Sequence, residues 1–183
     1  SETFLPRVIA KPDTLNDRNA EFEQTALAGP VFLNSVPKSG THLMRNIVRM
    51  FVPVEQQYHD AFIQHAILGQ HRAAFDASSP KLSWGHLLFS DASAIALRHV
   101  RHVLLVRDPY DWVLARARFF LSDTFQAGLD HLKNDTVTAN DVINMMIFGI
   151  HGKAPTLSEI YTHNAVSWIG TDTAIFRYED LLH

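Results

Sequence analysis

The chain has 183 residues, of which 46% are hydrophobic and 19% are charged, and its net charge is −3. This composition is typical of one globular domain over residues 1–183 and provides no basic surface for nucleic acid. The lack of cysteine excludes disulfides, thiolate catalysis and cysteine-ligated metals, and the scattered histidines lack metal-ligand spacing, so we expect no metal. The longest apolar runs fall far short of the roughly 18 residues of a membrane span. Charged residues interrupt the leader segment 1–29, so we expect a cytoplasmic protein that does not contact membranes.

Short apolar runs alternate with longer helical patterns along the rest of the chain. The run 31–36 predicts a strand that ends at Pro37, and apolar residues at helical spacing then predict a helix that stops at Pro53. The runs 102–106 and 173–176 predict two further strands. This alternation predicts an α/β fold with three layers, in which a central, mainly parallel sheet lies between helices. The other predicted segments are helices at 91–100, 109–120, 140–148 and 156–168 and an irregular connection at 122–139.

The strongest motif lies where the first predicted strand meets its helix, at Pro37-Lys38-Ser39-Gly40-Thr41-His42. A helix N-terminus exposes unpaired N–H groups and a positive dipole end, and Gly40 lets the backbone curl around an anion. Lys38 adds a positive charge, and Ser39 and Thr41 add hydroxyl donors. These properties predict a phosphate site, and an ordinary strand–helix turn with a capping hydroxyl is the alternative. The loop of nucleotide triphosphatases differs, because there the lysine follows the glycine.

This motif resembles the 5′-phosphosulfate loop of the sulfotransferases that use 3′-phosphoadenosine 5′-phosphosulfate. Two further segments resemble the same family in the same order. Residues 103–111 are similar to the strand and turn whose arginine, here Arg107, holds the 3′-phosphate. Residues 176–181 are similar to the strand-end motif whose tyrosine, here Tyr178, contacts the adenine. The resemblance covers about residues 30–182 and implies a P-loop-like sulfotransferase fold, and each motif lies at the carboxyl end of a predicted strand, where open α/β sheets bind ligands.

A fourth segment, residues 81–87, resembles the family segment whose histidine, here His86, deprotonates the acceptor hydroxyl. Imidazole suits this task because its ordinary pKa is close to neutral pH. The alternative is a histidine that packs beside Trp84 in a surface turn. Asp108 is expected to cap the helix that begins at Pro109 rather than to take part in chemistry.

The sequence departs from the family pattern at three places. Eight residues after Arg107 the family usually has a serine that donates to the 3′-phosphate, and this chain has Ala115. The loss of one hydrogen bond to a charged group costs about 1.5–3 kcal/mol. His42 stands where many relatives carry a small hydroxyl residue. The family also continues into a basic, glycine-containing loop, so we expect the C-terminal part of the family domain to be missing after His183.

The resemblance implies an enzyme that moves a sulfuryl group from 3′-phosphoadenosine 5′-phosphosulfate to a hydroxyl or amine of a small-molecule acceptor, by in-line displacement and without a metal. Residues 55–80 and 122–155 are expected to shape the acceptor pocket, and nothing in the sequence indicates an oligomeric state. The alternatives are a small-molecule or nucleotide kinase on a related fold and a nucleotide-binding module without catalysis. Lys38 and His86 would be catalytic, and the residues expected to bind the nucleotide are Pro37, Lys38, Ser39, Gly40, Thr41, His42, Arg107 and Tyr178.

Overall fold

The structure is a computed structural model of the chain, and it describes residues 11–121 and 137–183. The contacts divide these residues into two compact units. One unit is formed by Pro12–Arg107 and Thr162–His183, and the other by the described residues of Asp108–Tyr161. The prediction of one domain stays a prediction, because two compact units can belong to one domain. The start of the predicted leader and most of the predicted connection 122–139 lie outside the described residues.

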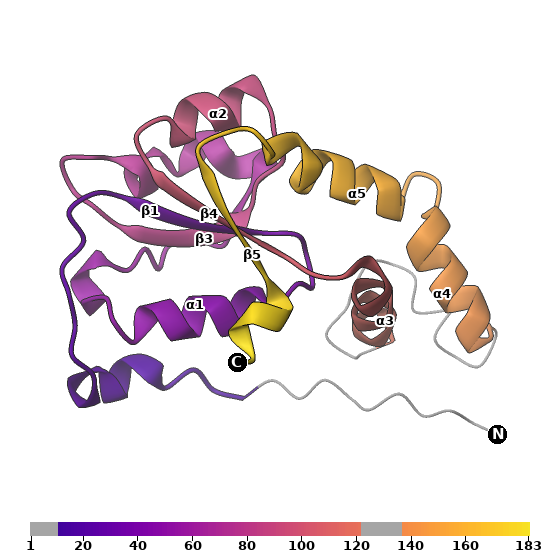
Figure 1. The fold of residues 1–183 in the computed structure, drawn as a ribbon, viewed down its shortest axis with the longest axis horizontal. Helices are drawn as coiled ribbons and strands as arrows, with labels where there is room; N and C mark the ends of the chain where they lie inside the picture. The colour runs from indigo at the N-terminus through magenta and orange to yellow at the C-terminus, as the bar shows by residue number, and fades with distance from the viewer. Residues whose placement is uncertain (1–10, 122–136) are drawn as a thin grey trace. The chain divides into compact units, whose positions relative to one another are not determined.

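The first unit contains a sheet of five strands in the order β2-β3-β1-β4-β5, and every neighbouring pair is parallel (Figure 1). The predicted α/β fold with a central, mainly parallel sheet is therefore confirmed. Parallel pairing places the carboxyl ends of all these strands at one edge of the sheet. The strands are β1 (Val31–Ser35), β2 (Ile63–Gln64), β3 (Leu82–His86), β4 (Arg101–Val106) and β5 (Thr173–Arg177).

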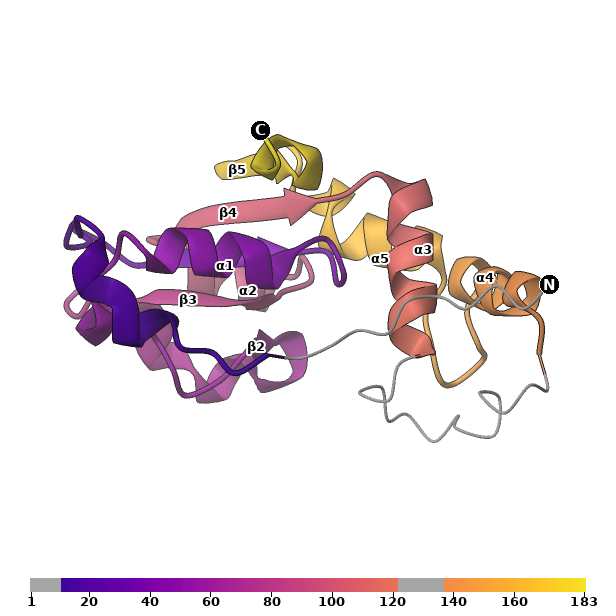
Figure 2. The same cartoon turned by 90° about the horizontal axis from the view of Figure 1, so that it is seen from below.

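One face of the sheet is covered by α1 (Thr41–Arg49), which runs along the strands (Figure 2). Side chains alternate between the two faces of a strand, so Leu33 of β1 and Leu105 of β4 point to this helix and pack with its Met44. The burial of these apolar side chains, each worth roughly 1.5–3 kcal/mol, fixes the helix against the sheet.

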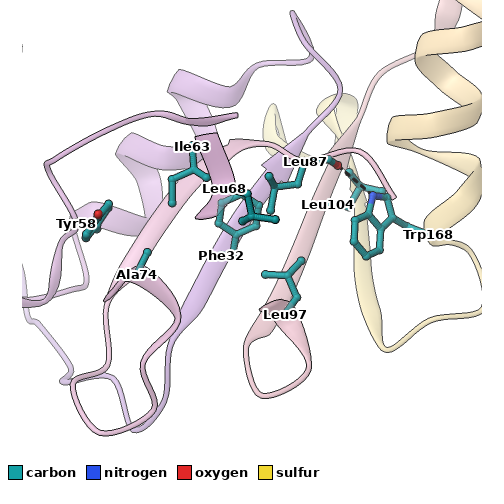
Figure 3. Close-up of a cluster of buried hydrophobic side chains, with 9 residues drawn as sticks. All are labelled: Phe32, Tyr58, Ile63, Leu68, Ala74, Leu87, Leu97, Leu104 and Trp168. Carbon is teal, nitrogen blue, oxygen red and sulfur yellow. Dashed lines mark hydrogen bonds between the residues drawn. The ribbon is translucent and has the colours of Figure 1, made fainter. Parts of the chain in front are cut away.

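The opposite face packs against α2 (Asp91–Leu97) and short 3₁₀ helices (Figure 3). Phe32, Ile63 and Leu104 are sheet residues of this cluster, and Leu97 of α2 belongs to it as well. The indole Nε1 of Trp168 donates a hydrogen bond of 3.2 Å to the carbonyl of Leu87 in the same cluster. The short 3₁₀ helices of the described residues are η1 (Leu15–Glu21), η2 (Val54–Gln56), η3 (His65–Gln70), η4 (Arg72–Phe75), η6 (Val166–Trp168) and η7 (Tyr178–Leu181).

Two strands were not predicted. β3 has the sequence Leu-Ser-Trp-Gly-His, which contains no continuous apolar run. The sequence pattern therefore did not predict this strand, although its first four residues are buried. Gly85 permits a close approach of β2, because a Cβ at this position would lie 1.8 Å from the carbonyl oxygen of Ile63. β2 has only two residues, which is too short for any periodic pattern. The leader also contains η1, where an irregular segment was predicted.

The second unit contains α3 (Pro109–Phe120), α4 (Ala139–Phe148) and most of α5, which runs over Leu157–Asn164. Asp108 caps α3 as predicted, since its carboxylate accepts from the amides of Tyr110 and Asp111. In the described residues no helix combines the length and the apolar character that crossing a membrane requires.

Candidate functional site

The loop between β1 and α1 has an unusual backbone. Gly40, the N-cap of α1, has φ +96°, and Lys38 has φ +64°. A positive φ is uncommon for a residue other than glycine and costs roughly 1–2 kcal/mol. Strain of this kind concentrates at functional sites. The amide of Ser39 donates to the carbonyl of Val36 at 3.1 Å, so this amide is used inside the loop, and the amides that begin α1 are the ones that an anion would meet.

Ser39 also has a buried hydroxyl. Its side chain is fully buried, and its Oγ has no hydrogen-bond partner among the described residues. An unsatisfied buried hydroxyl costs about 1–3 kcal/mol, so such groups are normally completed by a water or a ligand. The Ser39 hydroxyl, which is the predicted donor, is therefore not used by another described residue.

Three segments that are distant in the sequence meet at this loop. The ring of Tyr178 lies over Gly40, where an added Cβ would come within 2.5 Å of the ring carbon Cδ2. The guanidinium carbon of Arg107 lies 4.3 Å from the centroid of the same ring. An Nη of Arg107 donates to the carbonyl of Lys38 at 3.4 Å. The residues predicted to bind the two phosphates and the base are thus neighbours.

The sheet explains this convergence. β1, β4 and β5 are adjacent, and their register pairs Ser35 with Leu105 and Val106 with Arg177. Arg107 and Tyr178 are the residues that follow β4 and β5, so both emerge at the same edge as the loop after β1. This edge is where open parallel sheets bind ligands.

Lys38 is half-buried in this loop. Burial penalises its ammonium form and lowers its pKa to about 8. The side chain therefore remains mostly charged at neutral pH, and partial removal from water strengthens its attraction for an anion.

His86 is the last residue of β3 and lies in a strand, not in a surface turn. Its Nδ1 lies 2.7 Å from the carbonyl oxygen of Ser35. Because a carbonyl oxygen only accepts, the neutral ring carries its hydrogen on Nδ1 and its lone pair on Nε2. Burial lowers the pKa of His86 to about 4, well below the expected near-neutral value; the hydrogen bond to the Ser35 carbonyl opposes this shift, and the charge of Lys38 adds to it. The ring is therefore neutral at pH 7, which is the form that accepts a proton.

Hydrogen bonds tie His86 to the loop after β1. The hydroxyl of Ser35 lies 3.2 Å from His86 Nδ1 and 2.6 Å from the hydroxyl of Thr41. Leu87, the residue after His86, is held as well. The side chain of Asn34 accepts from the Leu87 amide at 2.9 Å and donates to the Leu87 carbonyl at 3.0 Å. These buried polar contacts set the position of His86 relative to the first turn of α1.

A cleft of about 550 Å³ opens beside His86. Its walls come from α1, from β3 and from the segment before η3, all within the first unit. Part of the predicted acceptor segment 55–80 therefore borders His86, whereas residues 122–136 of the other predicted segment lie outside the described residues. The cleft is lined by Asp13, His42, Arg45, Arg49, His59, Ala61, Phe62, Gln64, Trp84 and His86.

Sequence reasoning missed several residues of this region. Asn34 and Ser35 are fully buried polar residues at the end of an otherwise apolar strand, and that combination is the signal that could have drawn attention to them. His42, predicted to contact phosphate, lines the same cleft as His86. Among the described residues, no group of three or more histidine, aspartate or glutamate side chains is arranged to hold a metal ion.

The comparisons with known proteins support the fold. No protein-family model matches the sequence. No curated protein matches it either. Among solved structures, the crystal structure of mouse sulfotransferase SULT7A1 complexed with PAP matches with a TM-score of 0.53 and 14% sequence identity over 93% of this chain. The chain spans 58% of the length of that protein, and at this identity the likeness shows that the two share a fold.

Proposed function

We propose that the chain is a sulfotransferase that moves a sulfuryl group from 3′-phosphoadenosine 5′-phosphosulfate to a hydroxyl or amine of a small-molecule acceptor. The observation that carries this proposal is the meeting of Arg107, Tyr178 and the strained loop around Lys38 at the carboxyl edge of the sheet. The fold shared with a sulfotransferase that was crystallised with PAP agrees with it. A cytoplasmic location belongs to the same proposal.

The residues around the loop fit an anionic nucleotide. Ser39 offers a buried hydroxyl without a partner, and the first turn of α1 offers amides and the positive end of the helix dipole. In the proposal, Lys38, Ser39, Gly40, Thr41 and the flanking Pro37 and His42 surround the 5′-phosphosulfate. Arg107 holds the 3′-phosphate, and Tyr178 faces the adenine.

His86 and Lys38 would act on opposite sides of the reacting sulfur. The acceptor oxygen or nitrogen forms a bond to sulfur while the bond from sulfur to the bridging phosphate oxygen breaks. The proton of the acceptor moves to Nε2 of His86, which carries the lone pair. The electron pair of the broken bond stays on the phosphate oxygen, where the ammonium of Lys38 stabilises the added charge. Positioning and electrostatics carry out this transfer, so the mechanism needs no metal.

Calorimetric titration with 3′-phosphoadenosine 5′-phosphate, compared with ATP and Mg²⁺, tests the nucleotide site. We expect binding of the first ligand in the micromolar range or tighter, and weaker binding of the second. Tighter binding of ATP with Mg²⁺ would favour a kinase and overturn the proposal.

A transfer assay with the sulfated donor and a broad acceptor panel tests the chemistry. Sulfated product that disappears in Lys38→Ala is the expected result. Tight nucleotide binding without transfer to any acceptor would instead indicate a binding module that has no catalytic activity.

A further inference from the structure

The cleft beside His86 carries an excess of positive charge. Asp13 lies 2.7 Å from Arg49 and 3.7 Å from Arg45, so one carboxylate faces two guanidinium groups. Arg49 is buried and also donates to Gln57 at 2.9 Å, so its guanidinium is engaged by contacts within the protein. Arg45 has the longer contact with the carboxylate. The described acidic and basic side chains of the wall therefore leave one positive charge, and it belongs to Arg45.

Two histidines of the cleft, His42 and His86, have lowered pKa values. The pKa of His42 is lowered by burial and then by the charges of Arg45 and Lys38, and only Asp13 opposes the effect. The pKa of His86 is lowered in the same sense by burial and by the charge of Lys38. Both rings therefore experience a positive potential and stay neutral at pH 7.

Arg45 is held in place by an aromatic wall. Its guanidinium carbon lies 5.4 Å from the ring centroid of Trp84, which is buried, and only 17% of the Arg45 side chain is exposed. A charge that is fixed and partly removed from water attracts an anion more strongly than a mobile surface arginine does. Trp84 also meets the ring of His59 edge-on at 6.3 Å.

A second aromatic ring connects the charged end of the cleft to His86. The ring of Phe62 lies 4.7 Å from the ring of His86 and 6.4 Å from the ring of His42. The cleft thus has an apolar wall, a neutral base at one position and a fixed cation at another.

We propose that the acceptor is an anionic amphiphile, whose carboxylate or similar group binds Arg45 and whose apolar body lies against Phe62 and Trp84, with its reacting hydroxyl or amine at His86. This inference rests on the proposed function for the reaction, whereas the binding of the anion depends on the cleft alone. A cationic acceptor meets repulsion from Arg45, and for a neutral acceptor Arg45 supplies no charge–charge attraction, since its partner is the Asp13 carboxylate that it shares with Arg49.

Three phenols with matched size and different tail charge test the proposal. They are 3-(4-hydroxyphenyl)propionate, 4-propylphenol and tyramine, measured by calorimetry in the presence of 3′-phosphoadenosine 5′-phosphate and by turnover with the sulfated donor. We expect the carboxylate to bind at least about tenfold more tightly than the neutral phenol, and tyramine to bind most weakly.

The variants Arg45→Gln and Arg45→Lys test whether Arg45 causes the preference for the carboxylate. The first should bring the carboxylate to the affinity of the neutral phenol, and the second should keep most of the difference because it keeps the charge. Arg101→Gln removes the same charge at the exposed start of β4, at the other end of the sheet, and should change nothing. Thermal unfolding of each variant shows whether the fold is retained.

The outcomes separate this proposal from the proposed function. Equal binding of the charged and neutral phenols, a preference that survives Arg45→Gln, or no binding of any of the three overturns the anionic acceptor even if the nucleotide binds. Arg45-dependent binding of the carboxylate without nucleotide binding or sulfate transfer keeps the anion site and overturns the sulfotransferase.

Discussion

The guanidinium of Arg107 lies over the ring of Tyr178, 4.3 Å from its centroid, although the two residues follow different strands. A cation–π contact of this kind contributes roughly 0.5–2 kcal/mol, depending on exposure. Each side chain therefore restricts the orientation of the other. Within the proposed function, the groups that bind the 3′-phosphate and the adenine form one unit, which is positioned before the nucleotide arrives.

Removal of the Arg107 charge should weaken nucleotide binding. Arg107→Gln loses a charge-assisted contact worth about 1.5–3 kcal/mol, so we expect the affinity for 3′-phosphoadenosine 5′-phosphate to fall by roughly 10–100-fold. Calorimetry measures this change, and Arg101→Gln serves as the charge-matched control. An unchanged affinity would remove Arg107 from the nucleotide site.

Gly40 should tolerate no side chain. Its φ of +96° disfavours any L-residue, and a Cβ would approach Tyr178 Cδ2 to 2.5 Å. We expect Gly40→Ala to lower the free energy of unfolding by about 1–3 kcal/mol and to weaken nucleotide binding. Gly69→Ala is the matched control, because that Cβ would meet no atom within 4 Å. Equal stability of both variants in urea unfolding would contradict the prediction.

The charge of Lys38 should limit activity at high pH. Burial lowers the pKa of Lys38 to about 8. The free enzyme therefore loses the ammonium charge as the pH rises through 8, and activity should fall with it. Lys38→Ala should reduce kcat by about 10²–10³-fold. Lys38→Arg keeps the charge at high pH, so its profile of kcat/KM should lack the basic limb. A basic limb that is identical in Lys38→Arg would assign it to another group.

The acid limb of the same profile should lie far below neutrality. His86 must be neutral to accept a proton, and its lowered pKa of about 4 means that activity is lost only as the pH falls toward 4. His86→Ala should lower kcat by about 10²–10⁴-fold, and His99→Ala, at the exposed end of the α2 segment, should not. An acid limb near pH 6.5 that persists in His86→Ala would point to a different base.

His102 should make the fold sensitive to acid. This ring in β4 is 4% exposed, packs 4.5 Å from Trp168 and has a pKa lowered by burial to about 4 from 6.5. The unfolded chain binds the proton more tightly, so the stabilisation is complete above about pH 6.5 and is lost as the pH falls toward 4, by up to about 1.4 kcal/mol per pH unit.

Urea unfolding between pH 7 and pH 5 measures this slope. His102→Phe keeps the ring contacts and removes the titrating group, so its free energy of unfolding should depend less on pH. His86 contributes in the same direction, so some slope should remain. A slope that is equal in His102→Phe and the parent would show that His102 does not titrate as described.

Local sequence patterns predicted much of the fold. β1, β4 and β5 each contain a short continuous apolar run, and the predicted helices after Pro37 and from Pro109 appear as α1 and α3. β3 was missed because its serine, tryptophan, glycine and histidine resemble a turn when read alone. They form a strand because β1 and β2 pair with both of its edges, and such pairing between distant segments leaves no local pattern.

For the candidate site, the sequence predicted which residues meet at the sheet edge but not their detailed contacts. Lys38, Arg107 and Tyr178 each follow a strand, so a parallel sheet brings them to one edge. The hydrogen bond from His86 to Ser35 depends on the register between β1 and β3, which the sequence does not encode locally. The lowered pKa values of His86 and Lys38 have the same origin, because burial depends on packing between segments that are far apart in the chain.

The two-residue strand β2 is a short edge strand with few hydrogen bonds to the sheet. β2 pairs with β3 through Ile63 and Gln64 alone, opposite Gly85 and His86, and one isolated bridge joins Gln57 to Leu82. β1, in contrast, pairs along its whole length with β4. Short edge pairings open at a fraction of the global unfolding free energy. Opening of this edge would move Phe62 away from His86 while the central strands stay paired, so the cleft would widen without global unfolding.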